Sequence, residues 1–343
     1  MVWASGVGSM PGGEVGGSGA ADAGNAASYT EAVRTVLGEL DLPYVPELPA
    51  RGAMAGLTGR AAGLLSVVGL GADLQPAGWR LTGSSDAGLD QRRARSLLAQ
   101  DLDTVEDLGQ GLEGPFKAQL CGPWTLAATL ERPRGDRMLA DHGARRDLAQ
   151  AWAEAAASHV GDLRRRFPGV ELLLQLDEPA LPAVLAGSVP TASGFGRHRT
   201  VHPPEASEAL GLVTAAVAAA GATPLVHCCA AEVPSSLIRG AGALGLSIDV
   251  TRLAPESYDG VAAAVEAGEW VLLGVVDATD PARGDDRVPT ERAERFLDML
   301  GLAPAERTVV TPTCGLAGAS TSWARQALGQ ARATARRLSP EPE

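Results

Sequence analysis

The sequence of 343 residues has almost no lysine: Lys117 is the single lysine among 29 basic residues, and all the others are arginines. An enzyme that forms a Schiff base would therefore have to use Lys117. No apolar run reaches the roughly 18 residues that a membrane-spanning helix needs, and residues 1–6 lack the basic and apolar regions of a secretory signal. We therefore expect a cytoplasmic protein that does not interact with membranes.

Positive charge is also scarce, since acidic residues outnumber basic ones and the formal net charge is −12. This excess disfavours nucleic acid as a partner. Four cysteines are too few for a disulfide scaffold in a chain of this length. In a reducing compartment their arrangement is better explained by metal binding or catalysis.

Short apolar runs alternate with longer helical patterns along the chain. The predicted strands are residues 4–9, 42–45, 116–120, 171–176, 223–227, 244–250, 270–276 and 308–313. The predicted helices are residues 30–40, 90–109, 142–167, 204–220, 233–239, 257–267, 290–300 and 321–338. This alternation predicts an α/β fold with a parallel sheet, and eight strands are the number that closes a single (β/α)8 TIM barrel. A doubly wound open sheet is the alternative.

Nothing between these elements resembles an interdomain linker, so we predict one domain over residues 1–338 and a frayed tail over residues 339–343. Residues 11–24 are mostly Gly, Ala and Ser and predict an extended Gly-rich loop after the first strand. Residues 278–287 predict a polar loop after the seventh strand.

Histidine and cysteine follow two of the predicted strands. His227 and Cys229 end the fifth strand, and Cys314 ends the eighth. Alternation along an extended strand places His227 and Cys229 on the same side and Cys228 on the other. Thiolate and imidazole are ligands that Zn²⁺ prefers, and Asp249, at the end of the sixth strand, is a candidate fourth ligand. The alternative is that these are small buried cysteines and a satisfied histidine.

Two further strand ends carry polar groups. Asp177 follows an apolar run and is a candidate to bind an ammonium group or to act as a base; a turn with solvated acids is the alternative. Gly8 and Ser9 are candidates for contacts to a substrate carboxylate, with a tight turn as the alternative. Pro11 stands where a dinucleotide fingerprint has its third glycine, which excludes that motif.

Six short motifs, taken in order and spacing, resemble the catalytic barrel of cobalamin-independent methionine synthase. They are residues 8–11, 121–125, 177–180, 227–229, 248–249 and 313–315. The resemblance covers residues 6–338. The family is grouped with uroporphyrinogen decarboxylases and zinc-dependent corrinoid:thiol methyltransferases, all of them TIM barrels.

The resemblance implies a zinc site and a homocysteine site. The implied zinc ligands are His227, Cys229, Asp249 and Cys314, with Asp249 at the place of a glutamate in the family. The implied homocysteine contacts are Val7, Gly8, Ser9 and Asp177, of which Asp177 holds the amino group.

The chain departs from the family in the half of the site that binds folate. Ala183 replaces a further acid, and Thr129 stands where a tryptophan stacks on the folate ring. The family's proton-donor histidine falls near Thr279, which leaves Asp277 as the nearest candidate proton donor. The family's long form also has a second barrel that helps to bind folate polyglutamate, and we expect this chain to act without one.

The resemblance therefore implies a zinc-dependent methyltransferase that acts on a small thiol. Homocysteine is the leading acceptor, with methionine as the product. The methyl donor is a methylfolate or a methylcorrinoid, the latter free or on a partner protein. The alternatives are a corrinoid-dependent methyltransferase for another thiol such as coenzyme M, a lyase of the uroporphyrinogen decarboxylase type, and a non-catalytic homologue.

Overall fold

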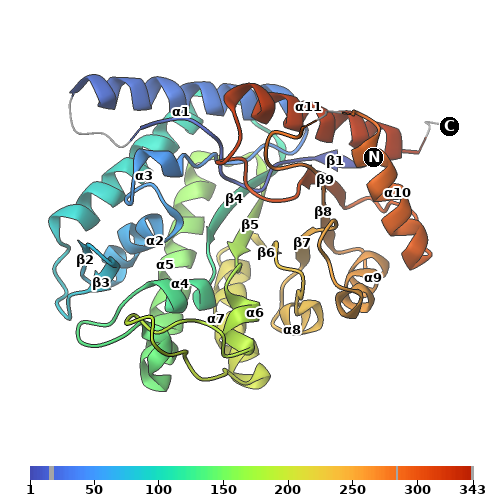
Figure 1. Ribbon diagram of the computed structural model, residues 1–343. Helices are drawn as coiled ribbons and strands as arrows, with labels where there is room; N and C mark the ends of the chain where they lie inside the picture. Colours follow the sequence, from blue (N-terminus) through green and yellow to red (C-terminus); the bar gives the residue numbers. More distant parts are fainter. Residues whose placement is uncertain (15–18, 283–284, 341–343) are drawn as a thin grey trace.

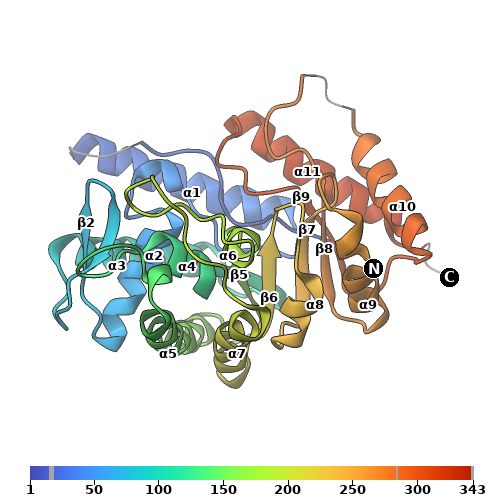
Figure 2. The same ribbon diagram turned by 60° about the horizontal axis from the view of Figure 1, so that its bottom comes forward.

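A curled parallel sheet forms the centre of the protein (Figures 1 and 2). The computed structural model describes residues 1–14, 19–282 and 285–340. The sheet has seven strands in the order β1-β9-β8-β7-β6-β5-β4, and each pair of neighbours is parallel. They are β1 (Trp3–Ala4), β4 (Gly114–Cys121), β5 (Val170–Asp177), β6 (Thr223–Cys228), β7 (Gly245–Asp249), β8 (Trp270–Val276) and β9 (Thr308–Pro312). The predicted α/β fold is confirmed.

The central strands are apolar on both faces because helices cover the outside of the curled sheet and side chains fill its inside. All residues of β8 are buried, as are all residues of β7 and β9. Continuous apolar runs of this kind are typical of parallel strands that are buried on both sides. Since the strands are parallel, their carboxyl ends share one rim, and the predicted site residues lie there.

The predicted second strand, residues 42–45, is not a regular strand. Pro43 and Pro46 each lack the N–H that a ladder needs. The segment nevertheless bonds to both edges of the sheet: Leu42 N donates to Ala4 O over 3.0 Å, and Val45 N donates to Lys117 O over 3.0 Å. In the described residues the curled sheet therefore has seven regular strands and an irregular segment between β1 and β4, rather than the predicted barrel of eight regular strands.

Helices surround the sheet, and α11 packs against β1 and β9 (Figure 1). Their bounds are α1 (Gly19–Glu39), α2 (Leu57–Leu65), α3 (Leu89–Leu108), α4 (Pro123–Thr129), α5 (His142–Arg166), α6 (Leu181–Leu185), α7 (Pro203–Ala219), α8 (Ser235–Gly240), α9 (Tyr258–Glu266), α10 (Val288–Leu300) and α11 (Thr321–Leu338). Short 3-10 turns are η1 (Pro49–Arg51), η2 (Ser66–Val68), η3 (Met138–Ala140) and η4 (Pro255–Ser257). No helix of the described residues is long and apolar enough to cross a membrane.

Three predictions about connections need correction or lie outside the described residues. The predicted loop over residues 11–24 is helical from Gly19 onward, because α1 begins there; residues 15–18 lie outside the described part. Residues 283–284 of the second predicted loop and residues 341–343 of the predicted tail lie outside it as well. An antiparallel hairpin of β2 (Ala72–Gln75) and β3 (Gly78–Leu81) was not predicted.

Candidate active site

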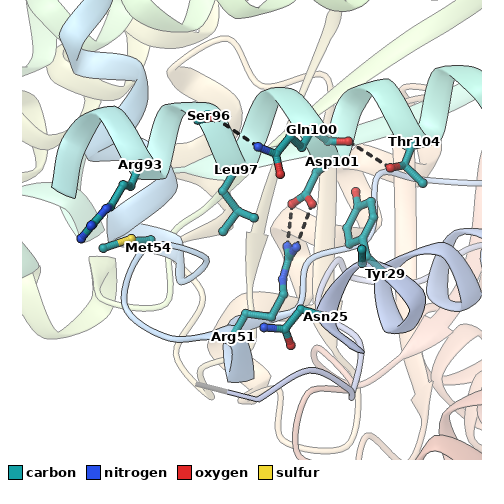
Figure 3. A pocket seen from close by; sticks show the side chains of 11 residues that line it. Asn25, Tyr29, Arg51, Met54, Arg93, Ser96, Leu97, Gln100, Asp101 and Thr104 are labelled. Carbon is teal, nitrogen blue, oxygen red and sulfur yellow. Dashed lines mark hydrogen bonds and ion pairs between the residues drawn. The ribbon is translucent and has the colours of Figure 1, made fainter. Parts of the chain in front are cut away.

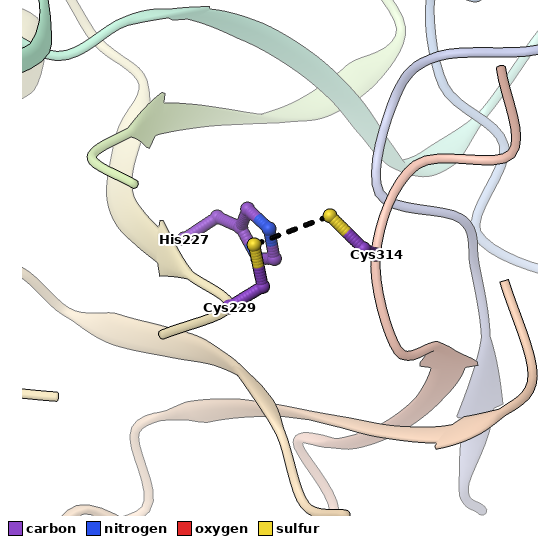
Figure 4. A group of neighbouring side chains, drawn as sticks. All are labelled: His227, Cys229 and Cys314. Carbon is purple, nitrogen blue, oxygen red and sulfur yellow. Dashed lines mark hydrogen bonds between the residues drawn. The ribbon is translucent and has the colours of Figure 1, made fainter. Parts of the chain in front are cut away.

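Three of the predicted ligand residues come together at the rim of the sheet (Figure 4). His227 lies in β6, Cys229 directly follows that strand, and Cys314 follows β9. One potential ligand atom of each residue lies within 4.8 Å of those of the other two. The Sγ atoms of Cys229 and Cys314 are 3.2 Å apart, well beyond the roughly 2.05 Å of a disulfide. Both thiols are therefore free to act as ligands.

The imidazole of His227 is held in one orientation. Its Nδ1 lies 3.1 Å from the carbonyl oxygen of Ser247, which can only accept, so Nδ1 carries the proton and donates it. Nε2 is consequently the unprotonated nitrogen. It is buried and has no partner among the described residues. A buried acceptor without a donor is costly, and metal-binding histidines in proteins are oriented in this way by a hydrogen bond from the other ring nitrogen.

The two thiols of the cluster share a proton through their hydrogen bond. That bond lowers the pKa of Cys314 and raises the pKa of Cys229. One nitrogen and two sulfurs, with one sulfur already favoured as thiolate, form a donor set that suits Zn²⁺. The three residues therefore fit a zinc ion, and they would hold it through one nitrogen and two sulfurs.

Asp249 ends β7 but is not one of the three clustered residues. Its Oδ1 accepts hydrogen bonds from the backbone N and the hydroxyl of Thr251, at 2.9 and 2.6 Å. Burial raises the pKa of the Asp249 carboxyl. Its role as a fourth ligand stays a prediction, because its carboxylate oxygens are not among the atoms that lie within 4.8 Å of one another in the cluster.

Asp177 lies beside the cluster, since β5 and β6 pair so that Asp177 is opposite His227. Gln175 Nε2 donates to Asp177 Oδ1 over 2.7 Å. Burial raises the pKa of Asp177 to about 6. A half-buried carboxylate at this rim is suited to receive a cationic group of a ligand.

The segment from Val7 to Ser9 lies between the sheet interior and the loop that carries Cys314. Ser9 O accepts from Leu316 N over 2.8 Å. A Cβ at Gly315 would lie 2.0 Å from Ser9 Oγ, so the serine hydroxyl directly contacts the residue after Cys314. Ser9 therefore contacts the loop that carries Cys314, and the role of Val7, Gly8 and Ser9 in substrate binding stays a prediction.

The family follows from comparison with known proteins. A family model described as "Cobalamin-independent synthase, Catalytic domain" matches residues 111–337. The chain belongs to this family. Among solved structures it is similar to a B12-independent methionine synthase from Shewanella sp. W3-18-1 in complex with selenomethionine, with a TM-score of 0.66, 14% identity and coverage of 98% of this chain and 97% of that chain.

The second similar structure is a protein of a different description. It is GH5_18 from Streptomyces cattleya in complex with GlcNAc, with a TM-score of 0.53, 14% identity and coverage of 99% of this chain and 83% of that chain. Identities this low support similarity of fold alone. No curated protein sequence matches the chain. The family assignment favours none of the alternative functions considered from the sequence.

Two motifs shared with the family meet through Glu178, a residue that sequence reasoning missed. The fully buried Glu178 carboxylate accepts from Trp124 N over 2.8 Å and from Thr125 N and Thr125 Oγ1 over 2.7 Å each. It thereby caps the first turn of α4. A Cβ at Gly122 would lie 2.3 Å from Glu178 Cδ, which explains the glycine in that motif.

Asp277, the predicted proton donor, lies after β8 in an ion pair with Arg292, with 2.8 Å between Nη1 and Oδ1. It is outside the His–Cys cluster. Its role as the proton donor stays a prediction. Trp323 Nε1 donates to its carbonyl oxygen over 3.0 Å, which ties the segment to α11.

The described part of the protein also contains a cavity of about 640 Å³ between α1, η1 and α3 (Figure 3). Its wall includes the buried pair Arg51–Asp101, joined by two hydrogen bonds of 2.8 and 2.6 Å. None of the cluster residues lines it. The cavity is therefore separate from the candidate metal centre.

Proposed function

We propose that this protein is a zinc-dependent methyltransferase that transfers a methyl group to the thiol of homocysteine and forms methionine. The observation that carries the proposal is the buried Nε2 of His227, which lies beside the thiols of Cys229 and Cys314 and has no hydrogen-bond partner in the part of the chain that the structure describes. A bound zinc ion supplies Lewis acidity that lowers the pKa of a coordinating thiol. Membership of the family supports homocysteine as the acceptor.

The residues of the chain would orient the amino-acid end of the acceptor. Asp177 binds the ammonium group, and the backbone N–H groups of Gly8 and Ser9 with the Ser9 hydroxyl bind the carboxylate. Both groups border the cluster, so the thiol of a bound amino acid extends toward it. In the reaction the sulfur–methyl bond forms as the bond between the methyl group and its donor breaks, and the thiol proton is released to solvent or to the donor.

The donor is a methylfolate or a methylcorrinoid, the latter free or on a partner protein. Thr129, at the end of α4, offers no ring to stack on a folate. We also propose that the protein is cytoplasmic, that residues 1–338 act as one barrel closed by the irregular segment 42–47, and that nucleic acid is not a partner.

Two measurements on the purified protein test the function. Elemental analysis should give about one zinc ion per chain. The zinc-loaded protein should convert homocysteine to methionine with methyltetrahydrofolate or with methylcobalamin, and the donor that works identifies the class. A protein that stays metal-free after zinc addition under reducing conditions, or a zinc-loaded protein that methylates homocysteine with neither donor, contradicts the proposal.

Asp177→Asn should raise KM for homocysteine about 30-fold or more, because the variant removes a charge partner of the ammonium group at a half-buried position. Zinc content should not change, since Asp177 is not in the cluster. The matched substrate is 4-mercaptobutyrate, which is homocysteine without its amino group. Its KM should be the same in both proteins, and an equal rise for both thiols would assign Asp177 a structural role.

Gly315→Ala should raise KM for homocysteine about tenfold, because the new methyl group would lie 2.0 Å from Ser9 Oγ and displace it. Gly318→Ala is the matched control, since a Cβ there would lie 3.7 Å from Thr279 Cγ2, which is an ordinary van der Waals distance. Steady-state kinetics on both variants, with zinc content measured in parallel, check the prediction. Equal KM values would show that the Ser9 hydroxyl does not contact the substrate.

A further inference from the structure

The only lysine of the chain lies inside the curled sheet, against the segment that borders the candidate metal centre. Lys117 projects from β4 and is fully buried. Its Nζ donates to the carbonyl oxygen of Val7 over 2.8 Å. Gln175 Nε2, from the neighbouring strand β5, donates to the same oxygen over 2.9 Å. Two interior side chains thus hold one carbonyl group.

This buried cation has no direct ion pair among the described residues. Its other contacts are Gln119 Oε1 at 3.5 Å and the ring of Tyr44, whose centroid is 5.1 Å from Nζ. Burial lowers the pKa of Lys117 to about 8, although the charges of Asp177 and Glu47 act in the opposite direction. A buried ammonium without a carboxylate partner is costly, so stability alone does not account for a lysine here.

The other side of the same peptide faces away from Lys117. No peptide bond of the described residues is cis, so the Gly8 N–H points opposite the Val7 carbonyl. Across the described residues, no acceptor is found for the N–H of Gly8 or of Ser9. Gly8 is buried, and a buried N–H without an acceptor is rare in native proteins. These two N–H groups therefore have the properties of donors to a ligand.

A charge-assisted hydrogen bond on a carbonyl oxygen polarises the peptide and strengthens its N–H as a donor. We propose that Lys117 is a positioning residue for the carboxylate of the amino-acid substrate, and that it acts through the Val7–Gly8 peptide. This inference rests on the proposed function, because it takes an amino-acid thiol as the ligand. Lys117 touches the peptide and not the substrate, and its positive charge also attracts the carboxylate at longer range.

Gln175 links the two ends of the amino acid. The same Nε2 that donates to Val7 O also donates to Asp177 Oδ1 over 2.7 Å. One amide group therefore fixes the positions, relative to each other, of the peptide proposed to bind the carboxylate and of the aspartate proposed to bind the ammonium group. Lys117 makes its hydrogen bond on the carboxylate side, while only its charge acts on Asp177. Ligands that lack the carboxylate or the amino group therefore separate its effects on the two sides.

The test compares two thiols on the zinc-loaded protein and on Lys117→Met. Homocysteine carries the carboxylate, and 3-mercaptopropylamine is homocysteine without it. Calorimetric titration should show that Lys117→Met weakens homocysteine binding about tenfold, as expected when a buried charge near an anion is removed at an effective dielectric constant of about 20. Binding of 3-mercaptopropylamine should change less than about twofold. Lys117→Arg, which keeps the charge, should recover part of the homocysteine affinity.

A single lysine also permits a test on the unchanged protein. In protein labelled with ¹³C-lysine the ε-carbon of Lys117 gives the one lysine signal, and homocysteine should shift it more than 3-mercaptopropylamine does. This measurement decides the question if Lys117→Met does not fold. The inference is overturned if Lys117→Met loses affinity for both thiols to the same extent. It is also overturned if both thiols shift the Lys117 signal of the unchanged protein equally. Failure of the unchanged protein to bind either thiol contradicts the proposed function instead.

Discussion

Cys314→Ser is expected to leave the purified protein with less than about a tenth of the zinc of the unchanged protein, because the loss of one of three ligands weakens binding at least about 100-fold. A serine hydroxyl stays protonated at neutral pH and is a poor ligand for zinc. His227 and Cys229 would remain in place, since both belong to β6 and its end. Transfer of a methyl group to homocysteine should fall with the zinc content.

The chain offers a matched control for this substitution. Cys228 adjoins the candidate ligand Cys229, but it is buried outside the cluster, and burial raises its pKa to about 12. Cys228→Ala should therefore keep the zinc. Elemental analysis of both variants and of the unchanged protein, purified without chelator under reducing conditions, gives the comparison. Full zinc content in Cys314→Ser, or equal loss in the two variants, would contradict a site built on Cys314.

The candidate metal centre could be predicted because its residues stand where apolar runs end. A parallel sheet places the ends of all its strands on one rim, so His227, Cys229 and Cys314 meet although 85 residues separate the two cysteines. The apolar run of each strand shows where the strand ends, and this is enough to predict which residues lie on the rim. The same reasoning did not assign a role to Glu178, because its contacts to Trp124 and Thr125 depend on side-chain positions beyond the strand ends, which the strand pattern does not give. Only the glycine at position 122 hints that another group approaches there.

The differences between the predicted and the observed fold have local causes in the sequence. Residues 42–45 have a strand-like apolar pattern, but the prolines at 43 and 46 prevent a regular ladder, and the segment bonds to its neighbours at isolated points. Residues 19–24 are rich in alanine, whose high helix propensity outweighs the two glycines, so α1 starts earlier than predicted. The unpredicted hairpin had a signal in Pro76, which lies in the turn, and in Gly78, which begins β3 with a φ of 132°.

Glu178→Ala should lower the free energy of unfolding by about 4 kcal/mol, because it leaves three donors at the start of α4 without an acceptor and opens a cavity. Those donors are Trp124 N, Thr125 N and Thr125 Oγ1, at 2.7 to 2.8 Å from the carboxylate. The carboxylate itself is buried, which raises its pKa to about 7 against the effect of these hydrogen bonds.

The matched control lies on the same strand. Glu171 is exposed near the start of β5, so Glu171→Ala should change the free energy of unfolding by less than about 0.5 kcal/mol. Urea denaturation of the two variants measures the difference. Since α4 follows β4 at the rim, its loosening should also raise KM for homocysteine while His227, Cys229 and Cys314 still bind zinc. Equal stability of the two variants would mean that α4 does not depend on Glu178, and that the contact joins the two motifs without stabilising either.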